Sequence, residues 1–393
     1  MYHATKQTIL PTTIIGSLPR PSWYTVNLGT QSFMDAMTHA AYREQYTDAL
    51  CCFLKDQEVA GLDICTDGDC RFDSDYGGQN WNSYPPRHMS GFDQARPRVV
   101  PVRGVSFPRG HILHDYQEAK VMPPIVGSVG RGELQYTETW IAAQRLTTKP
   151  VKFGTISPDL VALGVQDHHY KDLRERILAI SDAMNEELVD LAAVGCPAVQ
   201  IEEPQIHFLR ARNLENDVLN APFLLDVFRN TVKGLRGKTE VWAHTCWGNP
   251  FQQRMFAEVQ SYGPALEAMN ELDADVITFE SCSSGGMDLE AIGKAITKPK
   301  IAIGVIDHHT LQIERAEDVA AHIRRALKHI PAERLVICSD CGMGRGGMSR
   351  RHAFFKMVAM VEGTNMVRRE LGLPQAPCLA ADPRLSLVAD VTA

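Results

Sequence analysis

Eight short apolar runs recur along the chain, and most of them are followed by a longer amphipathic stretch. The runs are rich in β-branched residues and nearly continuous in apolar character, which is typical of strands buried on both faces. They cover residues 12–17, 61–67, 150–156, 198–203, 240–246, 274–280, 300–306 and 334–341. Eight strands that alternate with helices predict an α/β fold, namely a (β/α)₈ TIM barrel. A doubly wound open sheet is the alternative.

The stretches between the runs have helical periodicity. In residues 172–193, apolar side chains recur at spacings of three and four, at Leu173, Ile177, Ile180, Met184, Leu188 and Leu191. Similar patterns cover residues 33–59, 215–235, 252–272, 316–329 and 349–371. Because α/β barrels commonly accommodate a chain of 393 residues in one unit, we expect a single barrel domain over residues 1–393.

One region breaks this alternation. Residues 71–130 are rich in Gly, Pro, Asn and Tyr and contain a strand-like segment at 98–105. Long connections of this kind are usually functional or disordered. We therefore expect an inserted excursion after the second strand, a hairpin with a long loop, that lies over the barrel mouth. Residues 373–393 form a Pro- and Ala-rich C-terminal tail without a motif.

Composition excludes several classes of protein. The net charge of −7 argues against non-specific binding to nucleic acid. No uninterrupted apolar run is long enough to span a membrane, and the first eleven residues lack the apolar core of a signal peptide. Ten cysteines in a chain of this length are not a disulfide framework, so we expect reduced thiols and a cytoplasmic location. The sequence allows a homo-oligomer.

Four residues at the ends of predicted strands have side chains that bind zinc: His244, Cys246, Glu280 and Cys341. Residues i and i+2 of a strand point the same way, so His244 and Cys246 share one face. The carboxyl ends of barrel strands converge on one mouth, which brings the other two nearby. One imidazole, two thiolates and one carboxylate suit four-coordinate Zn²⁺, and a zinc that accepts a substrate sulfur implies thiol activation. The alternative is that both cysteines are buried apolar residues and Glu280 is a surface acid.

The segment around Cys341 contains two further patterns. Cys338 and Cys341 form a C-x-x-C, but the redox version usually opens a helix, whereas this one lies along a strand end. The two side chains then point to opposite faces, so we expect Cys338 in the core and Cys341 at the metal. Residues 342–347 are glycine-rich but lack the Gly-Lys-Ser/Thr ending of a phosphate-binding loop. We expect a flexible turn beside the metal.

Six motifs resemble, in the same order, those of the catalytic barrel of cobalamin-independent methionine synthase and of the wider zinc-dependent thiol alkyltransferase family. The resemblance covers most of the chain and implies the short, single-barrel form. The motifs are Thr13-Ile-Ile-Gly-Ser17, Val199-Gln-Ile-Glu-Glu-Pro204, His244-Thr-Cys246, Asp275-Val-Ile-Thr-Phe-Glu280, Gly304-Val-Ile-Asp-His-His309 and Ser339-Asp-Cys-Gly342.

The resemblance implies roles for further residues. In this family the backbone that corresponds to Ile15, Gly16 and Ser17 holds the thiol amino acid. The acids that bind its ammonium group map to Asp69 and Glu202. Both positions remain acidic, but Asp and Glu are exchanged relative to the family pattern.

The resemblance leaves the alkyl donor open. The family's acid histidine maps to His309. The tryptophan that stacks on a pterin is expected after residues 152–158, but the stretch 159–164 reads Asp-Leu-Val-Ala-Leu-Gly. A folate donor is therefore not implied.

The leading hypothesis is an enzyme that transfers a methyl group to the thiol of homocysteine, or of a similar small thiol, through a zinc-bound thiolate. Its partners would be that thiol and a methyl or alkyl donor. The alternative is an epoxyalkane:coenzyme M transferase-like alkylation of a non-amino thiol, whose anionic group Arg345, Arg350 or Arg351 would bind. A purely structural zinc is disfavoured, because closed structural sites normally use only Cys and His. A metal-independent barrel like the porphyrinogen decarboxylases is disfavoured by the two cysteines and the histidine.

Overall fold

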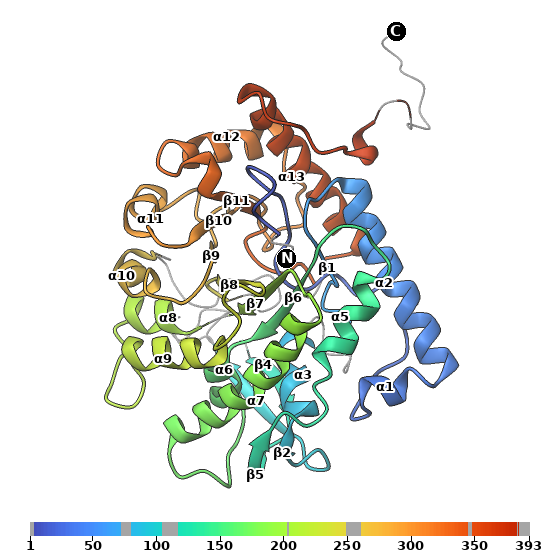
Figure 1. Cartoon of the computed structure of the whole chain (residues 1–393), viewed down its shortest axis with the longest axis vertical. Coiled ribbons are helices and arrows are strands. Elements are labelled where there is room, and N and C mark those ends of the chain that lie inside the picture. The colour runs from blue at the N-terminus through green and yellow to red at the C-terminus, as the bar shows by residue number, and fades with distance from the viewer. Residues whose placement is uncertain are drawn as a thin grey trace.

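The computed structural model describes residues 4–71, 80–103, 117–202, 204–248, 261–344, 348–382 and 384. Its centre is a curled, parallel seven-stranded sheet in the order β1-β6-β7-β8-β9-β10-β11 (Figure 1). The strands are β1 Cys65–Thr66, β6 Val151–Ile156, β7 Ala198–Glu202, β8 Glu240–Thr245, β9 Val276–Phe279, β10 Lys300–Gly304 and β11 Leu335–Cys338. Each lies inside one of the predicted runs, and the predicted α/β barrel-type fold is confirmed.

The first predicted run, residues 12–17, closes the ring without forming a regular strand. Thr12 makes one parallel bridge to Ile337 of β11. Its carbonyl accepts hydrogen bonds from the backbone of Asp63 and Ile64, just before β1, at 3.1 Å each. The ladder stops there because the amide of Ile15 donates to a side chain, the hydroxyl of Ser339, at 3.0 Å. The segment therefore occupies the eighth barrel position with a single bridge.

Helices surround this sheet (Figure 1). The predicted helix at 172–193 is α7 Leu173–Ala193, which begins after Asp172 because the Asp172 carboxylate accepts the amide hydrogen of Arg174. The predicted helix at 33–59 is interrupted, and that at 215–235 is shortened. The helices are α1 Phe33–Ala36, α2 Ala40–Ala60, α5 Tyr136–Gln144, α6 Pro158–Leu163, α7, α8 Ile206–Ala211, α9 Ala221–Thr231, α10 Leu266–Met269, α11 Leu289–Ala295, α12 Ala316–Leu327 and α13 Arg350–Glu370. Residues 252–260 of the predicted helix at 252–272 lie outside the described residues, and the described remainder contains only one short 3₁₀ turn and α10.

The amino ends of the strands are covered by the N-terminal segment. The backbone amide and the hydroxyl of Thr5 donate to the carboxylate of Glu240, at the start of β8, at 2.9 and 3.0 Å. Lys300, at the start of β10, donates to the carbonyl of Thr5 at 2.8 Å. Inside the ring, a separate apolar cluster comprises Ala4, Ile15, Ile64, Ala198, Trp242, Val276, Ala302, Val336 and Cys338. The candidate site described below lies at the opposite end of the barrel, where the strands finish.

The excursion that follows β1 contains α3 Asn80–His88 and two antiparallel strand pairs. Strand β2 Ser90–Phe92 pairs with β5 Ile125–Gly130, and β3 Arg98–Arg103 pairs with β4 Gln117–Met122. The second pair is the hairpin expected near residues 98–105. Residues 72–79 and 104–116 of the predicted excursion lie outside the described residues, and its role as a cover of the mouth stays a prediction.

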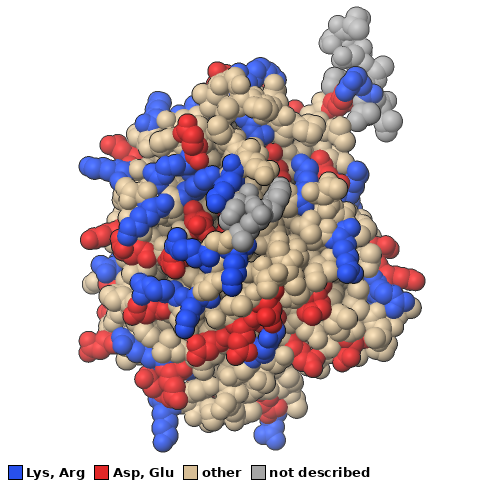
Figure 2. Space-filling view, in the orientation of Figure 1, with Lys and Arg blue, Asp and Glu red and all other residues tan. Residues whose placement is uncertain are grey.

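Two features of the structure concern membranes and nucleic acids, which the sequence does not predict as partners. Among the described residues, no helix combines the length and apolarity required to cross a bilayer. On the face shown in Figure 2, acidic and basic side chains are interspersed. Proteins that bind nucleic acid non-specifically instead present a continuous basic field.

Candidate metal and substrate site

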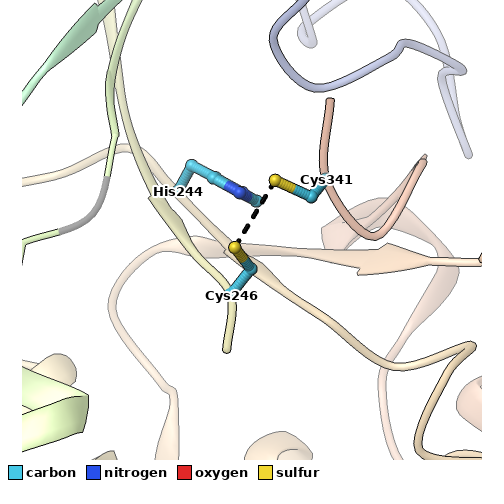
Figure 3. A group of neighbouring side chains, drawn as sticks. All are labelled: His244, Cys246 and Cys341. Atoms are coloured by element: carbon cyan, nitrogen blue, oxygen red, sulfur yellow. Dashed lines mark hydrogen bonds between the residues drawn. The ribbon is translucent and has the colours of Figure 1, made fainter. Parts of the chain in front are cut away.

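Three of the four predicted metal ligands lie together at the carboxyl ends of the strands. His244 is in β8, Cys246 follows that strand directly, and Cys341 lies three residues beyond β11. Their ligand atoms are all within 4.8 Å of one another, and the two sulfur atoms are 3.4 Å apart. Figure 3 shows the three side chains pointing toward one another. The group can therefore hold a metal ion without a large rearrangement.

Neighbouring side chains orient two of these ligands. Nδ1 of His244 lies 2.6 Å from the hydroxyl of Thr278, on the adjacent strand β9. The Nε2–H group of His207, in α8, donates to the carbonyl of Cys246 at 2.7 Å. Burial lowers the pKa of His244 well below its usual range. The imidazole is therefore neutral, which is the form that binds metals.

Glu280, the fourth predicted ligand, follows β9 and is buried, with 1% of its surface exposed. The interpretation of Glu280 as a surface acid is therefore wrong. One carboxylate oxygen accepts the amide hydrogen of Trp247 at 2.8 Å, and the other accepts the hydroxyl of Ser283 at 2.5 Å. Glu280 does not belong to the three-residue ligand group. Its role as a ligand stays a prediction.

A buried carboxylate, Asp340, holds the loop that follows Glu280. One of its oxygens accepts the amides of Ser281 and Cys282 at 2.8 Å each, and the other accepts the amide of Ser283 at 2.7 Å. Burial, with the charge of Glu280 adding to it, raises the pKa of Asp340 above its usual range. These three hydrogen bonds, together called the Asp340 cradle, were not predicted from the sequence. They place the hydroxyl of Ser283 against Glu280.

The opening segment Ile15–Gly16–Ser17 lies against the loop that carries Cys341. The hydroxyl of Ser339 accepts from the amide of Ile15 and donates to the carbonyl of Cys341 at 2.9 Å. A Cβ atom built on Gly342 would lie 2.8 Å from the Ser17 nitrogen. The first part of the glycine-rich turn is thus packed against the opening segment, and the expected flexibility of the turn stays a prediction. Arg345 lies outside the described residues.

Asp69 and Glu202, the predicted ammonium-binding acids, converge on this segment. A Cβ atom built on Gly16 would lie 3.3 Å from Glu202 Oε1 and 3.6 Å from Asp69 Oδ2. One built on Gly154, in β6, would lie 3.2 Å from Glu202 Oε1 and 3.6 Å from Asp69 Oδ1. The two carboxylates therefore flank one small space between β6 and the opening segment.

Within this space, one oxygen of Asp69 has a partner and the other has none. Oδ1 of Asp69 accepts from the guanidinium of Arg71 at 2.7 Å. Oδ2 is buried and accepts no hydrogen bond from any described residue. Burial raises the pKa of Asp69, the charge of Arg71 opposes this rise, and the charge of Asp67 adds to it. An unpartnered buried acceptor is costly, which suits a position that receives a donor from a ligand.

His309, the predicted acid, follows β10. Its Nδ1 lies 3.0 Å from a carboxylate oxygen of Asp307, and its ring centre is 3.7 Å from that of His308. Nε2 is buried and has no hydrogen-bond partner among the described residues. Burial lowers the pKa of His309, but the hydrogen bond to Asp307 and the charges of Glu280, Asp307 and Asp340 outweigh it, so the net direction is upward.

Two of the three arginines considered for an anionic thiol are engaged elsewhere. Nε and Nη2 of Arg350 bind both carboxylate oxygens of Asp56, at 2.7 and 3.0 Å. Arg351 lies over the rings of Phe354 and Phe355, at 4.8 and 5.0 Å. Arg350 is thus part of the contact between α13 and α2. Its role as a partner of a substrate anion stays a prediction.

Comparison with known proteins gives consistent matches over most of the chain. The sequence profile described as "Cobalamin-independent synthase, Catalytic domain" matches residues 94–365. A protein named methionine synthase from Saccharolobus solfataricus is 27% identical over 367 residues, covering 93% of this chain and 97% of that protein. A protein named 2-hydroxypropyl-CoM lyase from Xanthobacter autotrophicus is 29% identical over 395 residues, covering 92% and 96%.

A solved structure has the same fold. The B12-independent methionine synthase from Shewanella sp. W3-18-1, solved in complex with selenomethionine, aligns with a TM-score of 0.74 and 24% identity. The alignment covers 93% of this chain and 99% of that structure.

Proposed function

Because the chain belongs to the family of cobalamin-independent synthase catalytic domains, it is an enzyme of the methyltransferase type, and we propose that it methylates the thiol of homocysteine or a closely similar amino thiol. One observation carries the proposal. The His244, Cys246 and Cys341 group and the Asp69 and Glu202 pair both adjoin the opening segment. A thiol amino acid has a sulfur for the first group and an ammonium for the second.

Zinc is the metal that suits the ligand group. Two thiolates on tetrahedral zinc lie ~3.8 Å apart, given a Zn–S distance of about 2.3 Å. The observed sulfur separation of 3.4 Å is close to this value. Glu280, directly after the neighbouring strand β9, is the fourth ligand in the proposal. When bound, zinc would supply deprotonation of a coordinated thiol at neutral pH while leaving its sulfur nucleophilic.

The residues around the opening segment bind and orient the amino thiol. Asp69 Oδ2 and the carboxylate of Glu202 accept hydrogen bonds from the substrate ammonium, and each such charge-assisted bond contributes ~1.5–3 kcal/mol. The backbone of Ile15–Gly16–Ser17 holds the substrate carboxylate. Gly16 has a φ of 63° and its missing side chain leaves this approach open.

His309 acts as the acid in this proposal. Asp307 holds Nδ1, so Nε2 is the atom that can deliver a proton to the leaving group. The same orientation by a carboxylate is common for histidines that transfer protons.

A second candidate function is alkylation of a non-amino thiol by an epoxide. It is supported by the similarity to the 2-hydroxypropyl-CoM lyase, whose identity is as high as that of the methionine synthases. Arg345 remains the candidate partner for the anionic group of such a thiol, and the Asp69 and Glu202 pair would then have no ammonium to bind.

A thiol selectivity experiment separates the two functions. Protein with a measured zinc content is incubated with homocysteine or with 2-mercaptoethanesulfonate, and with methylated folate or epoxypropane, and the thioether product is identified by mass. Asp69→Asn and Glu202→Gln should weaken homocysteine use by ~10- to 150-fold. Preference for the sulfonate thiol, unaltered in both variants, would refute the amino thiol proposal.

A cysteine pair provides the matched control for the metal. Cys341→Ser should lower the zinc content, because Cys341 is in the ligand group. Cys338→Ser removes a thiol three residues away that lies in the apolar cluster inside the barrel, and it should keep the zinc. Equal zinc in both variants would contradict the assignment of Cys341.

A further inference from the structure

Lys152 is a charged side chain buried inside the barrel, directly below the site. Only 1% of its surface is exposed. Its ammonium group donates to Gln200 Oε1 at 2.5 Å and to the carbonyl of Ile14 at 3.1 Å, and it lies 4.4 Å from the centre of the Trp242 ring. Burial lowers its pKa to about 8. Lysine is almost never fully buried without partners, so these contacts require an explanation.

Gln200 connects Lys152 to Glu202. The Nε2 group of Gln200 donates to Glu202 Oε1 at 2.8 Å. A glutamine amide has an acceptor at one end and donors at the other, while a lysine ammonium only donates. Lys152 therefore determines which end of the Gln200 amide faces Glu202. Without the lysine, the amide could rotate and present its oxygen to the carboxylate.

The same lysine contacts the opposite wall of the substrate space. Its second acceptor, the carbonyl of Ile14, directly precedes the Ile15–Gly16–Ser17 segment. Glu202 Oε1, which Gln200 holds, is the atom nearest to a Cβ built on Gly16. Lys152 thus ties together β6, β7 and the opening segment at the point where Glu202 faces Gly16.

We propose that Lys152 is a positioning residue that acts through Gln200 to fix the carboxylate of Glu202 for a substrate ammonium group, and so determines the preference for amino thiols. The proposal rests on the proposed function and identifies what holds its recognition group in place. The competing interpretation is that Lys152 only fills the barrel interior. The two interpretations predict different thiol selectivity, because a side chain that only fills space would affect the binding of all thiols equally.

Two variants break the chain of hydrogen bonds from Lys152 through Gln200 to Glu202 at different points. Lys152→Met keeps the length and the apolar stem but removes the charge and both hydrogen bonds. Gln200→Met keeps Lys152 and its bond to Ile14 but removes the link to Glu202. If the two residues act as one unit, the double variant should weaken homocysteine binding no more than the single variants do, since effects within a connected chain do not add.

The test measures binding of two probes to the zinc-loaded protein by calorimetry, so that it does not depend on the alkyl donor. The probes are homocysteine and 4-mercaptobutanoate, which is homocysteine without its amino group. Each single variant should weaken homocysteine binding ~10- to 100-fold, as expected for one charge-assisted hydrogen bond, and change 4-mercaptobutanoate binding less than twofold. Zinc content and circular dichroism must match those of the unaltered protein; if Lys152→Met fails this check, Gln200→Met decides.

The outcomes distinguish this proposal from the function on which it rests. If the unaltered protein prefers homocysteine and the variants keep that preference, Lys152 is not a positioning residue but the proposed function survives. Equal weakening for both probes likewise overturns the positioning role. If the unaltered protein has no preference for homocysteine over 4-mercaptobutanoate, both the ammonium site and the role of Lys152 are refuted.

Discussion

Among the glycines that the structure describes, Gly304 is the one at which an added Cβ atom would meet its nearest neighbour most closely, and that neighbour is Asp340. A Cβ atom built there would overlap Oδ1 of Asp340 and would lie 2.7 Å from the Asp340 Cα. Rotation of the Asp340 side chain cannot relieve the second contact, because it involves the backbone. Gly304 does not have a positive φ, so the contact alone opposes alanine.

The expected loss in the free energy of unfolding follows from the hydrogen bonds that Asp340 accepts. Carbon atoms in contact normally lie ~3.5–4.0 Å apart, so Asp340 must retreat by ~1 Å. That retreat breaks or lengthens the bonds from the amides of Ser281 and Cys282, which both end on Oδ1. Two charge-assisted bonds at ~1.5–3 kcal/mol each give a loss of ~3–6 kcal/mol in the free energy of unfolding for Gly304→Ala. This is a large part of the ~5–15 kcal/mol that holds a typical domain folded.

The assay is urea unfolding at pH 8, followed by tryptophan fluorescence, together with measurement of zinc content. Gly127→Ala is the matched control, since a Cβ built on Gly127 meets only the Cα of Gly91, at 3.9 Å. It should change the free energy of unfolding by no more than ~0.5 kcal/mol. If Gly304→Ala also stays within ~1 kcal/mol of the unaltered protein, the argument that the cradle is rigid is refuted.

Two further predictions concern pH and substrate. Burial raises the pKa of Asp159 from 3.8 to about 6, so the folded state holds this proton more tightly than the unfolded chain does. The free energy of unfolding should therefore fall by ~3 kcal/mol from this group as pH rises from about 4 to about 6. Asp159→Asn should remove that fall, and a pH-independent difference between the two proteins would contradict it. Gly154→Ala adds a methyl group beside Asp69 and Glu202. It should weaken homocysteine binding ~10-fold or more, and equal loss with 4-mercaptobutanoate would argue against an ammonium site there.

Local patterns explain which parts of the fold could be predicted. The ends of α7 and α13 were predicted within one residue, because Asp172 and Ser349 cap them and the apolar spacing is regular. The pairing of His244 with Cys246 follows from the two-residue strand period. Residues 12–17 were predicted as a strand from their apolar character. Their single bridge reflects a contact between Ile15 and Ser339, 324 residues apart in sequence.

The hydrogen bonds that hold the site in place join residues far apart in the sequence, which only the closed barrel brings together. Local sequence patterns therefore could not predict them. Asp340 reaches amides 57 to 59 residues away, and Lys152 reaches Gln200 and Ile14 at separations of 48 and 138 residues. One signal was available for Lys152: it is a charged residue in a run otherwise typical of a strand buried on both faces. Such a residue needs buried partners, and these lie on the neighbouring strand and the opening segment.

The central claim, that His244, Cys246 and Cys341 hold a zinc ion that takes up the substrate thiol, is tested most directly by zinc K-edge X-ray absorption. Protein purified without added metal should contain about one zinc per chain, since the described ligand group forms one site of this composition. The spectrum should fit two sulfur neighbours before addition of homocysteine and three at saturation. Protein without zinc, or a sulfur count that stays at two in saturating homocysteine, would contradict the account.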